Sequence, residues 1–480
     1  MQGDFSRVTF DKDRRFSAVL AQQGRVQLDA DLNEQTAILM HYMRTLVTDL
    51  FGPAVYPAGI TGNEAGGFKV AFENGTFSVT RGRMYVDGIL CECGPGTNYQ
   101  NQPDGFPDPD RTPDFSASFV VYLRVWERLV TAAQEPSLRE VALGLHGPDT
   151  SARSRVVWQL DWLPAEESLL RHDTNPLVVL KARLDERLKP RGTLAAKVAR
   201  PEEGTDPCDL PPESGFRGPE NQLYRVEIHQ GGPAGKATFK WSRENASVVL
   251  PVRSAAGATL ELESLGRDGR LGVEAGDIVE IVDDATVCRA AADEISKEST
   301  SLYRVVEADH TARQVVLHDD PSQDRHQPGL GADPALHPVL RRWDHRPEPA
   351  KPKKKQEKAE DQPHAGRYTL LVDQGRWIDL EDGVQVHFGK DKEGEKPQQY
   401  RTGDYWLIPA RVVTGETEWP KDDQGEWSQK EPHGVDYHYA PLALVIRDRG
   451  EGRTKDRVND LRTPLRQPPP HPMGTVDPDQ

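Results

Sequence analysis

The chain has 480 residues, a length that favours about three domains over one ordinary core. Hydrophobic residues make up 36% and the mean hydropathy is -0.68, while 41 glycines and 38 prolines favour many short strands joined by turns. The formal net charge of -16 disfavours nucleic acid as a partner, because an acidic surface repels phosphates.

Targeting and redox signals are sparse. Residues 1–7 carry charges where a signal peptide needs an apolar run, and no stretch approaches the roughly 20 apolar residues of a membrane span. We therefore expect assembly in the cytoplasm and no membrane span.

Four cysteines are too few for a disulfide scaffold. Cys91 and Cys93 face the same way on a strand, but no second ligand pair accompanies them, so no metal or cofactor is expected.

Residues 1–52 are predicted to form an N-terminal docking arm and helix. The arm, residues 1–28, mixes large apolar side chains, Phe5, Phe10 and Phe16 among them, with arginines and cannot bury them alone. It is expected either to be disordered or to lie on another surface.

A single long helix is predicted over residues 31–51, capped by Asp29 or Asp31 and stopped by Gly52. Its apolar positions alternate by four and three, as in a coiled-coil seam: Leu32, Thr36, Leu39, Met43, Leu46 and Leu50. A second apolar flank contains Ile38, Tyr42, Val47 and Phe51. Two interpretations remain open: the seam faces a partner, or the helix is an ordinary amphipathic helix packed on its own β-domain.

The rest of the chain is predicted to be β-rich. Period-two alternation and turn signals such as Asn74-Gly75 and Asp87-Gly88 predict a first module over residues 60–200. Within it, residues 136–141 are expected to form a short helical turn and residues 176–180 a strand. A loop over residues 103–114 is rich in carboxylates but lacks the spacing of an EF-hand calcium site.

Closely spaced short strands predict a second module over residues 213–345, a small barrel or sandwich. A charged linker is predicted over 346–365, a third β-rich module over 366–446 and a flexible tail over 447–480. The predicted fold class is thus mainly β and multidomain, with an N-terminal arm and one amphipathic helix followed by β-sandwich or small-barrel modules.

Catalytic motifs are absent from the sequence: there is no P-loop, dinucleotide-binding glycine loop, nucleophile elbow or zincin helix. The cluster that most resembles a catalytic site contains His433, Tyr437, His438 and Tyr439. Residues of these types more often hydrogen-bond a turn onto a sheet than bind a metal or transfer a proton. The strand tryptophans are interpreted as core, with one exposed sugar-stacking ring as the alternative: Trp126, Trp158, Trp162, Trp241 and Trp406. We expect no enzymatic activity, and no catalytic or metal-binding residue is assigned.

Several strings are similar to an uncharacterised family found beside baseplate and tail components of phage-tail-like contractile injection systems. They include Gln2-Gly-Asp-Phe-Ser-Arg, Tyr122-Leu-Arg-Val-Trp-Glu-Arg and the stretches 23–35, 139–144, 220–229, 239–245, 380–386, 400–411 and 438–445. The Leu-Asn-Glu-Gln start of the helix also resembles the attachment end of some phage tail-fibre proteins.

The resemblance implies a structural or attachment component of such a particle: baseplate-associated, fibre-like or anchoring. Its expected partners are baseplate or other tail subunits and further copies of itself, and its expected location is a particle that is assembled in the cytoplasm and then released or anchored to the envelope. The residues expected to dock are Phe5, Phe10, Phe16, Leu32, Leu39, Met43, Leu46 and Leu50. The alternatives are a β-rich module that binds a cell-envelope glycan or surface component and a glycan-active enzyme with two carboxylates flanking a bond.

Overall fold

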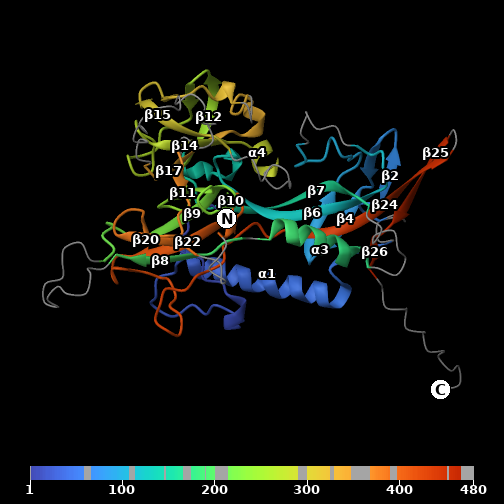
Figure 1. Cartoon of the computed structure of the whole chain (residues 1–480), viewed down its shortest axis with the longest axis horizontal. Helices are drawn as coiled ribbons and strands as arrows, with labels where there is room; N and C mark the ends of the chain where they lie inside the picture. Colours follow the sequence, from blue (N-terminus) through green and yellow to red (C-terminus); the bar gives the residue numbers. More distant parts are fainter. Residues whose placement is uncertain are drawn as a thin grey trace. The chain divides into compact units, whose positions relative to one another are not determined.

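The computed structural model describes most of the chain (Figure 1). The described residues are 2–58, 66–106, 114–144, 148–165, 175–189, 191–199, 215–289, 300–324, 329–346, 368–389, 397–450 and 453–465. The predicted linker over 346–365 and the last residues of the predicted tail lie almost wholly outside them. Strands dominate and helices are few, which confirms the mainly β, multidomain prediction.

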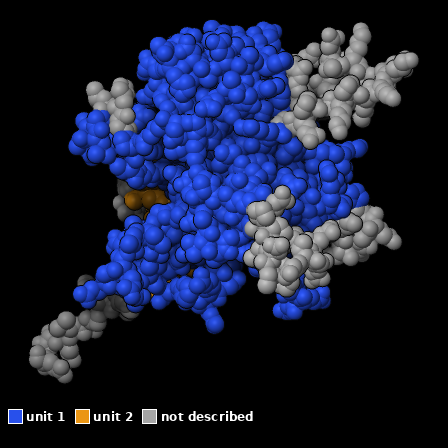
Figure 2. Space-filling model, turned by 90° about the vertical axis from the view of Figure 1, so that its left-hand side faces the viewer, with its two compact units in different colours: residues 1–38, 127–157, 184–436 blue, residues 39–126, 158–183, 437–480 orange. Residues whose placement is uncertain are grey.

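The chain divides into two compact units, each assembled from separate segments (Figure 2). Unit 1 contains residues 1–38, 127–157 and 184–436, and unit 2 contains residues 39–126, 158–183 and 437–480. The boundary falls inside the long helix α1 (Asp29–Phe51), so that helix contributes residues to both units.

Unit 1 contains a sandwich of a five-stranded and a three-stranded sheet. The larger sheet has the order β18 (Leu370–Leu371), β11 (Thr238–Ser242), β9 (Gln222–Gln230), β22 (Tyr405–Arg411) and β23 (Glu416–Thr417). The smaller has the order β19 (Ile378–Asp379), β20 (Val384–Phe388) and β8 (Leu194–Val198), and β10 (Gly232–Pro233) pairs with β21 (Gln399–Tyr400). One apolar core joins the two sheets, with Tyr224, Trp241 and Trp406 buried in it.

A closed six-stranded barrel follows in the same unit, with four of its strands labelled in Figure 1. Around the barrel the order is β12 (Val249–Ala256), β13 (Thr259–Leu262), β16 (Gln314–Leu317), β15 (Leu302–Asp309), β14 (Ile278–Val282) and β17 (Val339–Trp343). Alternate aliphatic side chains such as Leu260, Val305 and Val315 fill it, as the period-two pattern predicts.

Unit 2 is built mainly from antiparallel strands, although β1 and β26 pair in parallel. One four-stranded sheet has the order β25 (Arg453–Asp460), β24 (His438–Gly450), β6 (Phe119–Val130) and β7 (Arg153–Pro164). A second has the order β26 (Thr463–Pro464), β1 (Ala54–Tyr56), β4 (Gly82–Val86) and β5 (Ile89–Cys93). The hairpin of β2 (Val70–Glu73) and β3 (Thr76–Val79) contributes to an aromatic core of Phe72, Phe77, Phe115 and Phe119. Trp126, Trp158, Trp241 and Trp406 are buried, which confirms the core interpretation for them.

Helices are short apart from α1. Among the described residues the others are α3 (Pro176–Leu188), α4 (Asp284–Arg289) and 3-10 turns at Lys12–Arg14, Pro136–Leu138, Val141–Leu143, Pro321–Gln323 and Pro334–Leu336. The turn predicted near residues 136–141 is therefore confirmed. None of the helices among the described residues combines the length and apolar composition that a membrane span requires.

The strand predicted over residues 176–180 is wrong, because α3 begins at Pro176. Proline suits the first helical position, and Leu180 and Leu184, one turn apart, are both buried. The short run of valine and leucine over residues 177–180 looked like a strand, and the helical period only becomes apparent when Leu184 is included.

Two other boundaries differ from the predicted ones. The tail predicted from residue 447 begins as ordered strand, since Arg447 on β24 lies opposite Asp456 on β25 with a 3.0 Å ion pair. The segments predicted as second and third modules also share a sheet, with Tyr405 of β22 opposite Glu227 of β9. Pairing between distant strands leaves no local signal in the sequence, so the linear division into modules could not anticipate it.

Candidate docking surface and buried charge networks

The N-terminal arm lies along unit 1, held by polar side chains at the start of α1. The Ser6 backbone N–H and hydroxyl donate to the Asp29 carboxylate at 2.9 Å and 2.6 Å. The Thr9 hydroxyl donates to Glu34 at 2.5 Å. Burial opposes ionisation of Asp29, but the Ser6 hydrogen bonds outweigh it and lower the pKa of that carboxyl.

The first residues of the arm reach the interior of unit 1. Gly3 donates its N–H to the Asn245 carbonyl at 3.3 Å, and the Asn245 amide donates back to the Gly3 carbonyl at 2.9 Å. The Gln2 amide donates to the Glu227 carboxylate at 3.3 Å. A Cβ on Gly3 would stand 2.7 Å from Leu129, so only glycine fits there without displacing that side chain.

The apolar arm residues predicted to dock separate into two groups. Phe5 and Phe10 are half-buried on their own chain. Phe16 is exposed, with the Arg14 guanidinium 4.5 Å from its ring centroid. Among the three phenylalanines, Phe16 therefore presents the most apolar surface.

The predicted seam of α1 faces outward. Leu32, Leu39, Met43, Leu46 and Leu50 are each between 45% and 65% exposed. Since these residues recur by three and four along one helix, they form one apolar stripe, which we call the seam face.

The opposite face of α1 packs on the chain itself. Ala30 and Ile38 are buried. Farther along, a Cβ on Gly88 in the β4–β5 turn would lie 2.6 Å from the Arg44 Cα, so the hairpin touches the helix backbone. Of the predicted second flank, Ile38 is buried and Val47 half-buried, whereas Tyr42 and Phe51 are exposed. The helix thus turns all four of its leucines outward and buries only Ala30 and Ile38.

The two histidines of the cluster singled out in the sequence belong to different units, and each has contacts within its own unit. His433 belongs to unit 1, where it pairs with Tyr405 by two backbone hydrogen bonds and stacks near its ring, and burial lowers its pKa. His438 belongs to unit 2, where its Nδ1 lies 2.9 Å from Asp87. Lys181 shares that carboxylate at 3.0 Å. Both histidines therefore have structural contacts of their own.

A buried row of charges in unit 1 was missed from the sequence. Arg225 bonds Glu227 at 2.6 Å, Lys240 lies 3.3 Å from Glu227, and Lys240 donates to Glu280 at 2.9 Å. The Trp343 indole N–H also donates to Glu280 at 2.8 Å. Burial alone would raise the pKa of Glu280, but Lys240 and other positive charge outweigh it and lower the pKa to about 2.

The sequence predicted a short strand here but not that Arg225 and Glu227 on β9 are buried. One signal could have revealed the burial: Lys240 in β11 and Glu280 in β14 are charged residues, each with apolar neighbours in its strand. Each can serve as the partner that a buried charge needs, and the two pair at 2.9 Å.

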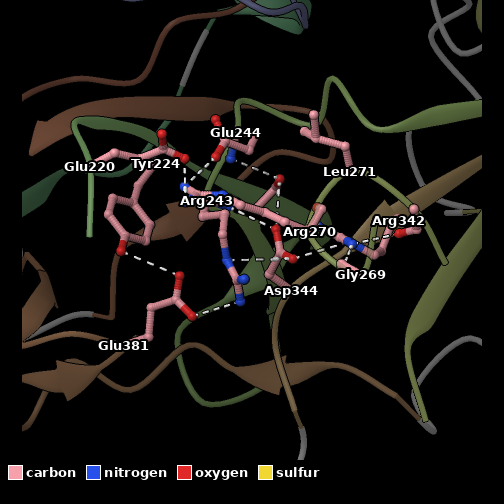
Figure 3. A network of polar contacts seen from close by, with 12 residues as sticks. Glu220, Tyr224, Arg243, Glu244, Gly269, Arg270, Leu271, Arg342, Asp344 and Glu381 are labelled. Atoms are coloured by element: carbon pink, nitrogen blue, oxygen red, sulfur yellow. Dashed lines mark hydrogen bonds and ion pairs between the residues drawn. The ribbon is translucent and has the colours of Figure 1, made fainter. Parts of the chain in front are cut away.

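A second polar network links the sandwich and the barrel of unit 1 (Figure 3). The Arg243 guanidinium lies between two carboxylates, 2.8 Å from Glu381 and 3.7 Å from Asp344. The Tyr224 hydroxyl donates to Glu381 at 3.3 Å. Burial raises the pKa of Glu381 to about 6 despite the neighbouring Arg243. On the barrel side, Arg342 lies 3.2 Å from Asp344.

Paired charges of this kind hold the sandwich and the barrel of unit 1 together. No cluster of three or more histidine, cysteine or acidic side chains placed to hold a metal occurs in the part of the chain that the structure describes. Cys91 and Cys93 are both buried, and burial raises the pKa of Cys91 to about 12.

The fold and surface thus define a mainly β, multidomain protein with an exposed helical seam. Residues 1–186 and 170–452 match the model of a family of unknown function, DUF6519, and the chain belongs to that family. No curated protein and no solved structure matches the chain.

Proposed function

We propose that this chain is a structural or attachment subunit of a larger assembly, and that it docks through its N-terminal arm and α1. The assembly suggested by the sequence resemblance is a phage-tail-like contractile injection particle, in which the chain would be baseplate-associated, fibre-like or anchoring. Its partners would be baseplate or other tail subunits.

The observation that carries this proposal is the orientation of α1. A surface helix of a globular protein normally turns its apolar face to the core. Here the helix packs through Ala30 and Ile38, while Leu39, Met43 and Leu46 meet solvent. Contiguous apolar surface of this kind marks interaction sites.

The free energy of burying apolar side chains also favours a partner that covers the seam face. Fully burying one large apolar side chain is worth about 1.5–3 kcal/mol. The five seam residues are roughly half exposed, so a partner that covers them would gain on the order of 5 kcal/mol before the costs of association.

The experiment is a sedimentation test. Particles are pelleted from cells that make the chain with an affinity tag at its C-terminal end, and the pellet is probed for the chain together with sheath and tube proteins. Cosedimentation is the expected result. Finding the chain only in the soluble fraction, with assembled particles that lack it, would reject the proposal.

A second candidate function rests on the outer face of the three-stranded sheet in unit 1. Trp377 is half-buried there, with the Lys197 ammonium 4.2 Å from its ring centroid and the His387 ring at 5.3 Å. An aromatic ring surrounded by polar groups is how many proteins bind sugars.

Pull-down with insoluble cell-envelope glycan tests this second candidate. Trp377→Ala should abolish binding if the sheet face is a sugar platform. Trp427→Ala is the matched control, because Trp427 is also half-buried with a lysine over its ring. Equal binding by all three proteins, or by none, would remove the candidate.

A further inference from the structure

We propose that copies of this chain associate through α1, with the helices parallel and in register. This inference deepens the proposed function, on which it rests, by naming the occupant of the seam face: the same face of a second copy.

The first argument is the regularity of the seam. Leu32, Leu39 and Leu46 recur every seven residues, and four residues after each of them comes Thr36, Met43 or Leu50. In heptad terms, leucine occupies every d position and Thr36, Met43 and Leu50 the a positions. Leucine at d together with β-branched residues at a favours parallel two-stranded coiled coils, and of the a residues here Thr36 is β-branched. In such coiled coils the a and d side chains of one helix fit between those of its partner.

The second argument is the placement of charge. The e and g positions beside the seam set partner choice in coiled coils through their charges. In α1 these positions carry Asn33, Gln35, Met40, Tyr42, Val47 and Asp49, of which only Asp49, in the last turn, is charged. Over residues 32–47 two identical helices can therefore approach without opposing charges at e and g, and no alternating charge pattern selects a different, oppositely charged partner.

The third argument is Thr36, the one polar residue of the seam. A parallel, in-register pair places Thr36 opposite its own copy, whereas an antiparallel pair places it opposite a leucine. A polar residue at a single a position is a known determinant of register. The Thr36 hydroxyl already donates to the Leu32 carbonyl at 3.1 Å, so its burial leaves no unpaired donor.

The test uses the full chain and two cysteine variants. Met43→Cys places a thiol in the seam, where parallel copies bring the two Cα atoms within disulfide range. Thr45→Cys is the matched control, because Thr45 is also exposed on α1 but lies off the seam. We expect air oxidation to yield a reducible cross-linked dimer of Met43→Cys and none of Thr45→Cys or of the unaltered chain.

Sedimentation equilibrium supplies the second readout. We expect the unaltered chain to be oligomeric, and Leu39→Asp with Leu46→Asp to be monomeric with an unchanged circular dichroism spectrum at room temperature. A monomeric unaltered chain, or an oligomer in which Met43→Cys does not cross-link, overturns the inference.

The failure of this inference and that of the proposed function are distinguishable. A monomeric chain that still enters particles, and loses that ability in the Leu39→Asp, Leu46→Asp variant, would leave the proposed function standing and make the seam partner another subunit. An oligomer that never cosediments with particles would leave self-association standing and reject the proposed function.

Discussion

Gly88 lies directly against the backbone of Arg44, since a Cβ on Gly88 would stand 2.6 Å from the Arg44 Cα. The glycine also has a φ of +77°, a conformation that other residues adopt at a cost. The β4–β5 hairpin of unit 2 therefore meets α1 at Arg44 as backbone against backbone.

Gly88→Ala should lower the free energy of unfolding by about 2–4 kcal/mol, the sum of left-handed backbone strain and overpacking against an atom that cannot move alone. Gly75→Ala is the matched control, with a φ of +75° in a similar hairpin turn and no atom within 4 Å of the added Cβ. Only the strain cost, about 1–2 kcal/mol, applies there. Urea unfolding of both variants measures the difference, and equal losses would show that the contact with α1 is unimportant.

The second prediction concerns the buried charge row. Lys240→Met removes the ammonium that lies 2.9 Å from Glu280 and leaves that carboxylate without its main counter-charge. Breaking a buried pair from one side costs about 3–5 kcal/mol. Arg376→Ala, which removes an exposed ion pair with Asp373, should change stability by less than about 1 kcal/mol. Similar effects of the two substitutions in thermal unfolding would contradict the burial of the row.

The third prediction is a pH dependence carried by Asp404. This carboxyl is fully buried, and burial raises its pKa from 3.8 to about 7 even though Arg401 and the Arg191 backbone N–H favour the charged form. The folded protein therefore keeps a proton that the unfolded chain releases above about pH 4. Its contribution to stability is complete below that pH and is lost as the pH rises towards 7, by roughly 4 kcal/mol.

Asp404→Asn should remove this slope, because the amide oxygen can still accept the 2.9 Å hydrogen bond from the Arg191 N–H but cannot ionise. Urea unfolding of both proteins between pH 4 and pH 7 tests it. A variant that keeps the full slope would mean that another group carries the dependence.

The sequence predicted local structure well where the pattern was short-range. The α1 seam, the barrel strands and the Asn74 and Asp87 turns, whose φ values are +52° and +45°, all followed from periodicity or turn chemistry. Interactions between segments far apart in the sequence could not be predicted. Nothing local to β9 shows that it pairs with β22, or that Gln2 bonds Glu227 across 225 residues. The seam pattern identified candidate docking residues but not the side of α1 that packs on its own chain.

The last prediction separates the two faces of α1. Leu39→Asp with Leu46→Asp places carboxylates on side chains that are already half exposed, so the melting temperature should change little. Ile38→Asp is the matched control on the same helix, because Ile38 is 5% exposed and a buried carboxylate there should cost several kcal/mol, on the order of 3 or more.

If the seam face docks, the Leu39→Asp, Leu46→Asp variant should fold normally yet be lost from pelleted particles, whereas Ile38→Asp should fail to fold. Circular dichroism melting and particle sedimentation on the same preparations give both answers. Unfolding of the double variant would mean that the seam packs on its own chain, because only a leucine already buried there makes a carboxylate costly to the isolated protein. Normal incorporation of a folded double variant would instead remove the seam from the docking surface and leave exposed arm residues such as Phe16 as its remaining candidates.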